Sequence, residues 1–326
     1  MKKRIIRRCL SCLAGLCLLL SGASGEEMTA EQIREILDES GVPYSEDIKV
    51  VPSFAPATVP RIRTERIRFD RKRTQELTEQ YGLPRKKGES WTCEIHSRLN
   101  PDYELLFEEE EGLYGSIAYD VYDPPVPLDE SDEGLCRAAE TVRAFLDGLG
   151  IEYEYPFYRV VPYKGYRDRE INGVELTVRF PLEGIPCNTT IGWTKDSDGS
   201  GNGDPTPGAF FIATRDGKLT TAVIRNPVTV TAAAEDPAPL KNWDEILRDS
   251  REEFIDFRKD EYGTYKLKLK YVQLVMMVDP HQEAYPAWAY TFDCHVERED
   301  GDYRSRGYDL MLTYNARTGR RVWCYP

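Results

Sequence analysis

The sequence predicts an α+β protein in which antiparallel sheets are each packed by a helix. Three observations predict it: amphipathic stripes with helical spacing, runs in which apolar and polar residues alternate, and an internal repeat of this order in the C-terminal two-thirds. We expect two repeated modules at residues 132–231 and 240–326. A smaller α+β region at residues 26–127 and a signal peptide at residues 1–25 precede them.

The N-terminus has the three-part layout of a secretory signal peptide. Basic residues are followed by the apolar run Cys9–Leu20 and then by small residues. The run is shorter than the roughly 20 apolar residues that a membrane span needs, and the acidic pair Glu26 and Glu27 comes soon after it. We therefore expect cleavage, after Ala23 or after Gly25, rather than anchoring.

A lipid anchor at Cys12 or Cys17 is the less favoured alternative. Cys17 follows Leu16, where a small residue is expected, and Cys12 leaves almost no apolar run before it. No later apolar stretch is long enough to cross a bilayer. The sequence thus predicts a secreted or cell-envelope-associated protein with no integral membrane span after signal removal.

The charge of the chain excludes nucleic acid as an expected partner. Its net charge is −13, and loss of the five basic residues before the apolar run makes it −18. A chain this acidic repels phosphate backbones and anionic lipid surfaces. Solubility is the plainest explanation of this charge.

The cysteines after the signal segment are odd in number and include no C-x-x-C pair, which argues against a structural zinc site and a thioredoxin-like motif. They are Cys93, Cys136, Cys187, Cys294 and Cys324. In a simple meander, one strand separates Cys294 from Cys324 and places their backbones about 9–10 Å apart. This exceeds the roughly 7 Å limit for a disulfide, so we expect no bond unless the strand order differs.

The first expected helix spans about residues 30–40. Thr29 and Gln32 form a capping box before it, and Gly41 follows its end. Residues 51–60 are spaced by prolines and are expected to form an extended connector.

A second helix is expected at about residues 70–81, and it carries a basic cluster. For this cluster a solvated helix face is favoured over a binding patch. Its members are Arg66, Arg68, Arg71, Lys72 and Arg73. Residues 91–97, 103–111 and 114–123 then alternate with period two, which predicts a small antiparallel sheet that closes the N-terminal region.

The first module follows a proline-rich, acidic linker at residues 123–133. A helical stripe begins at Leu135 and ends at Gly148 or Gly150. Strand-like segments come next, and Asp216-Gly217 predicts the turn of a hairpin.

The second module repeats this order. Asn242 is expected to cap a helix with Glu245 three residues on, and the apolar stripe extends to Phe257. Strand-like segments at 265–278 and 285–296 and a hairpin at 308–323 follow.

The second module resembles the PepSY-like and YycH/YycI-like modules of exported bacterial proteins. The resemblance rests on Tyr285-Pro286-Ala287-Trp288, which opens a strand, and on Tyr314-Asn315-Ala316-Arg317-Thr318-Gly319, which turns into Arg320 to Trp323. A looser version stands in the first module at GIPCN and TRDGKL, so the resemblance covers roughly Cys136 to Pro326.

The resemblance implies a non-enzymatic role, in which such modules bind or restrain partners, including proteases and sensor kinases, at the cell envelope. It offers no catalytic residue and no cofactor to carry over. Many proteins of this type have a membrane anchor, whereas this chain has the pattern of a cleavable signal. The resemblance by itself therefore does not decide between direct coupling to a transmembrane sensor and action as a free protein.

The sequence offers little for catalysis. It contains no G-x-S-x-G, H-E-x-x-H or G-x-x-x-x-G-K-[ST] motif, and its only histidines are His96, His281 and His295. His295 follows Cys294, but neighbours on a strand point to opposite faces. Carboxylates are abundant, and nothing selects one pair as a glycosidase site.

Two further segments each have a structural and a ligand-binding interpretation. Asp196, Asp198 and Asp204 lie in a glycine-rich stretch that is expected to be a flexible loop; calcium binding there would be weak, because the EF-hand pattern has Pro207 in place of its final glutamate. Aromatic residues face one side of a later strand, where core packing is favoured over a ligand groove. They are Trp288, Tyr290 and Phe292.

These observations together favour a non-catalytic extracytoplasmic protein that binds or regulates protein or peptide partners at the bacterial cell envelope. The partner is expected to engage sheet edges or the face opposite the helices. The alternatives are a secreted hydrolase with unidentified paired carboxylates and a calcium-stabilised structural protein.

Overall fold

The structure is a computed structural model that describes residues 27–325 except 54, 57, 68–70, 82–103, 109–127, 151–158, 165–169, 179, 188–207, 226, 261–262, 280 and 298–307. It contains two compact units, which are described separately. Unit 1 comprises Met1–Ile62, Ala233–Met277 and Ala284–Pro326, and unit 2 comprises Arg63–Ala232 and Val278–Glu283.

The boundaries of these two units differ from those of the three regions predicted from the sequence, at residues 26–127, 132–231 and 240–326. Those three regions remain predictions. The expected signal peptide lies outside the described residues, as do the strands expected at 91–97 and 114–123. No helix among the described residues is long and apolar enough to cross a membrane.

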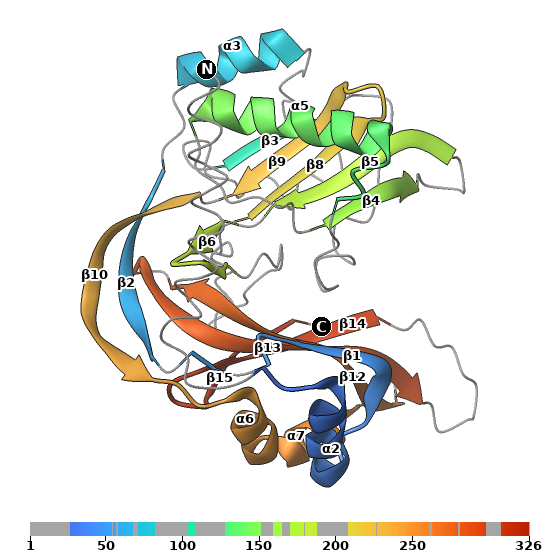
Figure 1. The fold of residues 1–326 in the computed structure, drawn as a ribbon, viewed down its shortest axis with the longest axis vertical. Helices are drawn as coiled ribbons and strands as arrows, with labels where there is room; N and C mark the ends of the chain where they lie inside the picture. Colours follow the sequence, from blue (N-terminus) through green and yellow to red (C-terminus); the bar gives the residue numbers. More distant parts are fainter. Residues whose placement is uncertain are drawn as a thin grey trace. The chain divides into compact units, whose positions relative to one another are not determined.

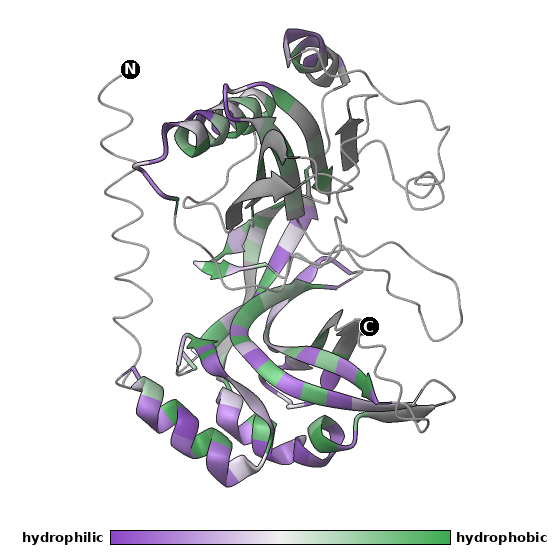
Figure 2. Ribbon diagram, turned by 90° about the vertical axis from the view of Figure 1, so that its right-hand side faces the viewer, coloured by the Kyte–Doolittle hydropathy of each residue, from purple (hydrophilic) through white to green (hydrophobic). Residues whose placement is uncertain are grey.

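Unit 1 begins with helix α2, Ala30–Ser40, whose capping was predicted from the sequence. The Thr29 side chain accepts a hydrogen bond from the Gln32 amide, and the Gln32 side chain accepts one from the Thr29 amide. Gly41 ends the helix with a left-handed φ of 70°. Hydrophilic and hydrophobic residues alternate along α2 (Figure 2), which lets it bury one side.

Helices α6, Trp243–Asp249, and α7, Arg251–Ile255, stand where the sequence predicts one helix. The helical run is interrupted at Ser250, and Phe257, expected on its stripe, lies beyond the end of α7. Asn242 occupies the N-cap position, but its side chain makes no capping bond. Its Oδ1 instead accepts from the amide of Ala55 at 2.9 Å, so a tertiary contact replaces the expected local one.

Unit 1 contains an eight-stranded sheet in which five strands follow one another side by side. Their order is β1 (Tyr44–Val51), β12 (Gly263–Val278), β13 (Glu283–Glu297), β14 (Tyr308–Asn315) and β15 (Arg321–Tyr325). The last three strands pair antiparallel, with Trp288 opposite Tyr314 and Leu312 opposite Cys324. Strand β14 therefore lies between the strands of Cys294 and Cys324, the order for which no disulfide is predicted.

Further strands of this sheet come from segments far apart in the sequence. Strand β1 is parallel to β12, and β11, Arg258–Asp260, is antiparallel to it. Strand β2, Thr58–Arg66, pairs with β13 and with β10, Val228–Pro239. Part of the expected extended connector at 51–60 thus forms sheet, because its hydrogen-bonding partners come from distant segments.

Hydrogen bonds tie the N-terminal segment of unit 1 to its C-terminal segments. The indole Nε1 of Trp243 donates to the Ser53 carbonyl at 3.0 Å, and the Arg317 guanidinium donates to the Val59 carbonyl. The Arg251 guanidinium donates to the Ser40 carbonyl, at the end of α2. The described residues between 27 and 62 are therefore part of the same unit as the C-terminal segments.

The core of unit 1 contains a group of aromatic side chains beneath α6 and α7, all less than 2 % exposed. The Phe254 ring lies 5.2 Å from that of Tyr290 and 5.1 Å from that of Phe292. The buried Tyr290 hydroxyl donates to the Trp243 carbonyl at 2.6 Å. The aromatic face of the strand is therefore core, as expected. The group comprises Trp243, Phe254, Trp288, Tyr290, Phe292 and Tyr314.

Unit 2 has a five-stranded antiparallel sheet with helix α5, Glu133–Leu149, across one face (Figure 1). The strand order is β3 (Glu104–Glu108), β9 (Leu219–Arg225), β8 (Gly208–Thr214), β5 (Glu170–Val178) and β4 (Arg159–Lys164). A short ladder joins β6, Pro181–Leu182, and β7, Ile185–Pro186. The expected hairpin at Asp216-Gly217 joins β8 to β9. Strand β3, expected in a sheet of the N-terminal region, pairs with β9.

Helix α5 buries an apolar stripe against this sheet. It ends at Gly150, which is one of the two end positions predicted from the sequence. Helix α3, Arg71–Tyr81, confirms the second expected helix and packs on α5. Fully buried core residues from α5 and the strands include Ala138, Val142, Phe145, Leu146, Val174, Leu176, Phe211 and Ala222. The predicted α+β class, with helices packed on antiparallel sheets, is confirmed.

Replacement of Phe254 by alanine is expected to lower the free energy of unfolding of unit 1 by about 3–5 kcal/mol, because it leaves a cavity among closely packed rings. Guanidinium unfolding followed by tryptophan fluorescence measures it. The matched control is Val322→Ala, since Val322 is 38 % exposed and a surface change costs within about 0.5 kcal/mol. Equal effects of the two substitutions would contradict the described core.

Candidate functional site

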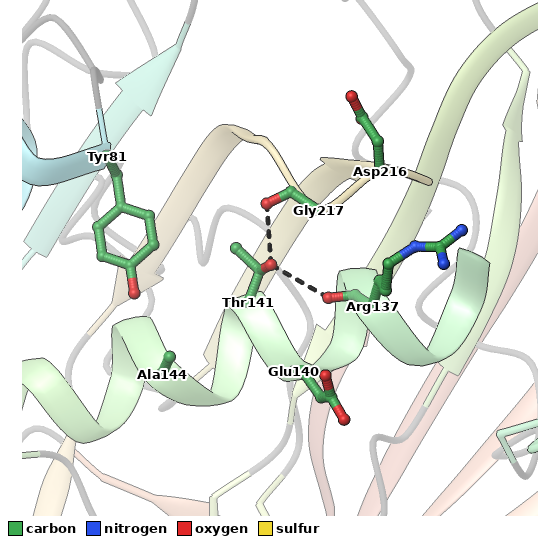
Figure 3. A pocket seen from close by; sticks show the side chains of 7 residues that line it. All are labelled: Tyr81, Arg137, Glu140, Thr141, Ala144, Asp216 and Gly217. Carbon is green, nitrogen blue, oxygen red and sulfur yellow. Dashed lines mark hydrogen bonds between the residues drawn. The ribbon is translucent and has the colours of Figure 1, made fainter. Parts of the chain in front are cut away.

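A shallow, open hollow lies in unit 2, where α5 meets α3 and the turn between β8 and β9 (Figure 3). Its volume is about 350 Å³. It is lined by Tyr81, Arg137, Glu140, Thr141, Ala144, Asp216 and Gly217. Three separate elements therefore contribute side chains to one surface.

The floor of the hollow is a direct contact between α5 and the β8–β9 turn. The Thr141 hydroxyl has one proton to donate, and two carbonyl oxygens lie within reach of it, that of Gly217 at 2.9 Å and that of Arg137 at 3.0 Å (Figure 3). Gly217 has φ of 92°, and a Cβ there would stand 3.1 Å from the Thr141 Oγ1. Glycine thus permits both the turn and its close approach to the helix.

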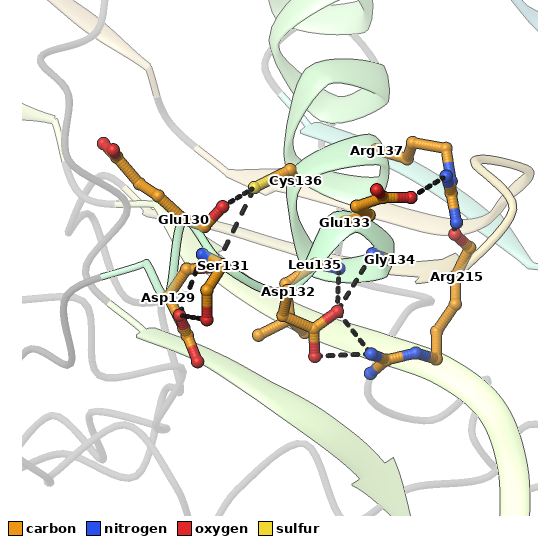
Figure 4. Close-up of polar contacts among 10 residues, drawn as sticks. All are labelled: Asp129, Glu130, Ser131, Asp132, Glu133, Gly134, Leu135, Cys136, Arg137 and Arg215. Atoms are coloured by element: carbon orange, nitrogen blue, oxygen red, sulfur yellow. Dashed lines mark hydrogen bonds and ion pairs between the residues drawn. The ribbon is translucent and has the colours of Figure 1, made fainter.

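An ion pair holds the same turn to the beginning of α5 (Figure 4). Asp132 caps the helix by accepting from the amides of Gly134 at 2.9 Å and Leu135 at 3.1 Å. Both carboxylate oxygens of Asp132 also accept from the guanidinium of Arg215, which lies in the turn. The hydrogen bond from Arg215 is the main cause that lowers the pKa of Asp132, and the backbone amide of Leu135 adds to it.

Arg137 adds a third link between the helix and the turn. Its Nε donates to the Arg215 carbonyl at 3.1 Å, and its Nη1 lies 3.4 Å from the Glu133 carboxylate one helical turn earlier (Figure 4). The charge of Arg137 is therefore partly offset by Glu133. These contacts lie at the surface, and their effect is to set the position of the turn rather than to add much stability.

Tyr81, the last residue of α3, forms one side of the hollow. Its ring packs edge-on against Phe145 at 5.3 Å, and Phe145 packs in the same way on Phe211 in the core. Burial raises the pKa of the Tyr81 hydroxyl, so the hydroxyl is neutral at physiological pH.

Helix α3 is fixed to α5 at Gly148. A Cβ on Gly148 would stand 2.7 Å from Cδ2 of Leu77, and Arg73 Nε donates to the Gly148 carbonyl at 2.7 Å. In the predicted basic cluster, Lys72 and Arg73 are exposed and both lie near Glu76. Arg73 thus has a structural contact as well as a solvated position, whereas Arg68 lies outside the described residues.

Two acidic residues, Asp216 and Glu140, are among the residues that line the hollow. The pKa of Asp216 is lowered, first by a hydrogen bond from Thr214 and also by the nearby charges of Arg137 and Lys218. Asp216 is therefore ionised at neutral pH. Glu140 is exposed on the facing helix, and its carboxylate points away from that of Asp216 (Figure 3).

The other candidate residues from the sequence lie elsewhere. Asp196, Asp198 and Asp204 are outside the described residues, and within the described ranges no group of three potential metal ligands occurs. Cys294 is fully buried and His295 half-buried, as expected for neighbours on opposite faces of a strand.

Sequence reasoning identified the Asp216-Gly217 turn and the helix after Leu135 but not the hollow between them. Asp132 carries a local signal, since an aspartate directly before a helical stripe is a common N-cap. Tyr81 and Thr141 carry none, because their roles depend on residues distant in the sequence.

No protein-family model and no curated protein matches the sequence. Solved structures do match it. An uncharacterized protein from Eubacterium rectale ATCC 33656 aligns with a TM-score of 0.57 at 12 % identity, over 91 % of this chain and 99 % of that one. At this identity the likeness shows a shared fold alone. The Bacillus megaterium YpeB C-terminal domain aligns at 10 % identity over 68 % of this chain and 70 % of that one, with a TM-score of 0.29, too low to support an argument.

Asp132→Asn is expected to lower the melting temperature at neutral pH, and Asp132→Ala to lower it further. Asparagine keeps the helix cap but loses the ion pair with Arg215. Because the folded pKa of Asp132 lies below the ordinary 3.8, its contribution is present above that value and is lost as the pH falls through the folded pKa. Differential scanning calorimetry from pH 7 to pH 2, with Glu130→Gln as control, measures it. A pH-independent difference from the unsubstituted chain would refute the ion pair.

Thr141→Val is expected to release the turn from α5, because valine keeps the shape and removes the donor to the Gly217 carbonyl. The cost is about 0.5–1.5 kcal/mol, typical of one hydrogen bond. Amide hydrogen exchange of residues 214–218 should become faster, while Thr141→Ser leaves it near the original rate. Unchanged exchange in the valine variant would show that the turn does not depend on this contact.

Proposed function

We propose that this chain is a non-catalytic extracytoplasmic protein that binds or regulates protein or peptide partners at the bacterial cell envelope. The observation that carries the proposal is the open hollow beside α5, which is built on a rigid helix and a fixed turn and presents side chains suited to recognition. The acidic side chains of the hollow are exposed, its tyrosine hydroxyl is neutral, and the charge of its arginine is partly offset by a neighbouring carboxylate. Such groups hold a ligand by complementarity, and a surface this open does not exclude water as bond-making sites usually do.

The place of action in this proposal rests on the signal-like N-terminus and on the family resemblance. The YPAW and YNARTG segments that carry the resemblance fall on β13, on β14 and in the turn that follows β14. This turn contacts the residue before the N-cap of α6, since the Lys241 amide donates to the Ala316 carbonyl at 2.8 Å. The segments that carry the resemblance therefore join strands of unit 1 to the residue before α6, and they hold no group that the resemblance assigns to catalysis.

The internal repeat belongs to the same proposal, and two features support it. In unit 2, α5 precedes β4, β5, β8 and β9, which are neighbours in that order; in unit 1, α6 and α7 precede β12, β13, β14 and β15, again in order. In both, the final turn contacts residues at the start of the preceding helix. We propose that the two stretches are copies of one PepSY-like module.

A photo-crosslinking experiment tests the proposed function. The chain is produced in its native bacterium with benzoylphenylalanine at Ala144, in the hollow, or at Val322, on the surface of unit 1, and is irradiated in intact cells. We expect a discrete adduct with an envelope or secreted protein that depends on the position of the probe. Recovery of the chain only from the cytoplasm would overturn the proposal.

A second experiment distinguishes the proposed binding role from an enzymatic one. The purified chain is therefore incubated with cell-wall glycan and with casein, and products are measured by mass spectrometry. Turnover that disappears on replacing a pair of carboxylates by amides would replace the proposed role with that of a secreted hydrolase.

A further inference from the structure

Strand β10 is a sheet edge that is paired on one side. Among the described strands it pairs with β2 alone, and it runs beside that strand (Figure 1). The Thr231 hydroxyl donates to the Arg63 carbonyl of β2 at 3.1 Å, and the Ile67 amide donates to the Pro227 carbonyl, just before β10, at 2.7 Å. These contacts fix the side of β10 that faces β2, so an added strand would pair with the opposite side.

The first half of this edge is open to solvent. Four consecutive residues, Thr229 to Ala232, are exposed. Successive residues of a strand point to opposite faces of the sheet, so the exposure of all four means that neither face of β10 is covered at these positions. Val230 is 42 % exposed, and a strand laid against β10 would bury apolar surface there.

The sequence of this half lacks the groups that usually protect an edge. A free edge is a template for pairing with another chain, and proteins commonly block it with charged side chains or proline. Residues 228–234 (VTVTAAA) contain neither, and valine and threonine favour strands. The other edge strands described in the two large sheets do carry such residues: Glu46, Asp47 and Lys49 in β1, Glu104 and Glu108 in β3, Arg159, Pro162 and Lys164 in β4, Arg258, Lys259 and Asp260 in β11, and Arg321 in β15. The first half of β10 is therefore the exception within this chain, as expected of an edge that receives a strand.

Charge limits what can be added to this edge. In the sequence, β10 continues into Glu235 and Asp236, and the net charge of the chain is −13. Two copies of so acidic a chain repel each other, and an acidic segment is repelled in the same way, whereas a basic one is attracted. Main-chain hydrogen bonds supply the affinity of an added strand, and its side chains supply the selectivity. The edge therefore fits an extended, uncharged segment that is flanked by basic residues.

We propose that residues 228–234 of β10 bind an extended segment of a partner protein by strand addition. The uncharged part of this segment pairs with the VTVTAAA stretch, and a flanking lysine or arginine lies opposite positions 235 and 236. This inference rests on the proposed binding function, and it names the surface that is used and the kind of segment that it recognises.

Titration with a defined peptide tests it. The peptide acetyl-Lys-Val-Thr-Val-Thr-Val-Lys-amide is added to the purified, isotope-labelled chain and followed by NMR. We expect the backbone amide signals of β10 and β2 to shift and amide hydrogen exchange at residues 229–232 to become slower, while the edge strand β1 stays unchanged as an internal control. The same peptide with glutamate at both ends should bind about three- to ten-fold more weakly at low salt, because its charges are reversed.

Two N-methylated forms of the peptide separate strand addition from other binding. Successive residues of a strand direct their N–H groups to its two edges in turn. A form methylated at its second and fourth residues and a form methylated at its third and fifth residues therefore lose donors on opposite edges. We expect one form to bind at least about ten-fold more weakly than the other, because it alone loses the hydrogen bonds to β10. Equal affinities of the two forms overturn strand addition.

Substitutions at the edge give the matching test in the chain. Val230→Lys places a charge on the edge and should weaken peptide binding by about ten-fold. Val230→Thr keeps an uncharged strand former and should stay within about two-fold of the original. The matched control is Val322→Lys, since Val322 is 38 % exposed on the edge strand β15 and a change there should also stay within about two-fold. Undiminished binding by the Val230→Lys variant overturns the proposal, and the N-methylated peptides test it without any substitution.

The remaining outcomes separate the edge from its alternatives and from the broader function. Absence of peptide binding, or equal protection of β1 and β10, overturns the edge site. A concentration-dependent dimer in sedimentation that Val230→Lys abolishes assigns the edge to a second copy and overturns it too. If crosslinking in cells captures an envelope protein while the peptide does not bind, the binding function stands and uses another surface. If the peptide binds as expected but crosslinking yields no partner, the edge site stands and the proposed cellular role fails.

Discussion

Helix α5 lies across its sheet because one stripe of its surface is apolar, and this burial places every other group at the hollow. Phe145 and Leu146 enter the core on the sheet side, which turns Arg137, Glu140, Thr141 and Ala144 outward or sideways. The free energy of this arrangement comes from the apolar stripe. The polar contacts at the edge of α5 determine where the β8–β9 turn and helix α3 lie against it.

Two kinds of contact then position the elements around α5. Asp132, before the first turn of α5, and Thr141, in its middle, hold the β8–β9 turn through an ion pair and a hydrogen bond. Near its end, Gly148 allows Leu77 of α3 to approach closely, and Tyr81 follows one helical turn later. The hollow is the space left between these two attachments, which explains why its lining comes from three elements.

Unit 1 shows the same dependence on burial with a different connection. Its helices cover a group of aromatic rings, and the buried polar atoms among them have partners, as with the Tyr290 hydroxyl on the Trp243 carbonyl. The N-terminal segment adds a parallel strand and a helix to this unit and satisfies the Trp243 indole through Ser53. A segment that was predicted as part of a separate region therefore completes a core made by distant residues, as with Ser53 and Trp243, which are 190 positions apart.

The sequence by itself determined the features that depend on neighbours along the chain. The α2 capping box, the glycine end of α5, the hairpin at Asp216-Gly217 and the alternation of the C-terminal strands all follow from local spacing and backbone preference. The tertiary structure decided that β3 pairs with β9 and that the ends of the expected connector belong to strands β1 and β2. It also decided that the Asn242 side chain accepts from the Ala55 amide, and that Tyr81 and Thr141 line one hollow. Each of these depends on which distant groups are close enough to bond, and local periodicity carries no information about that.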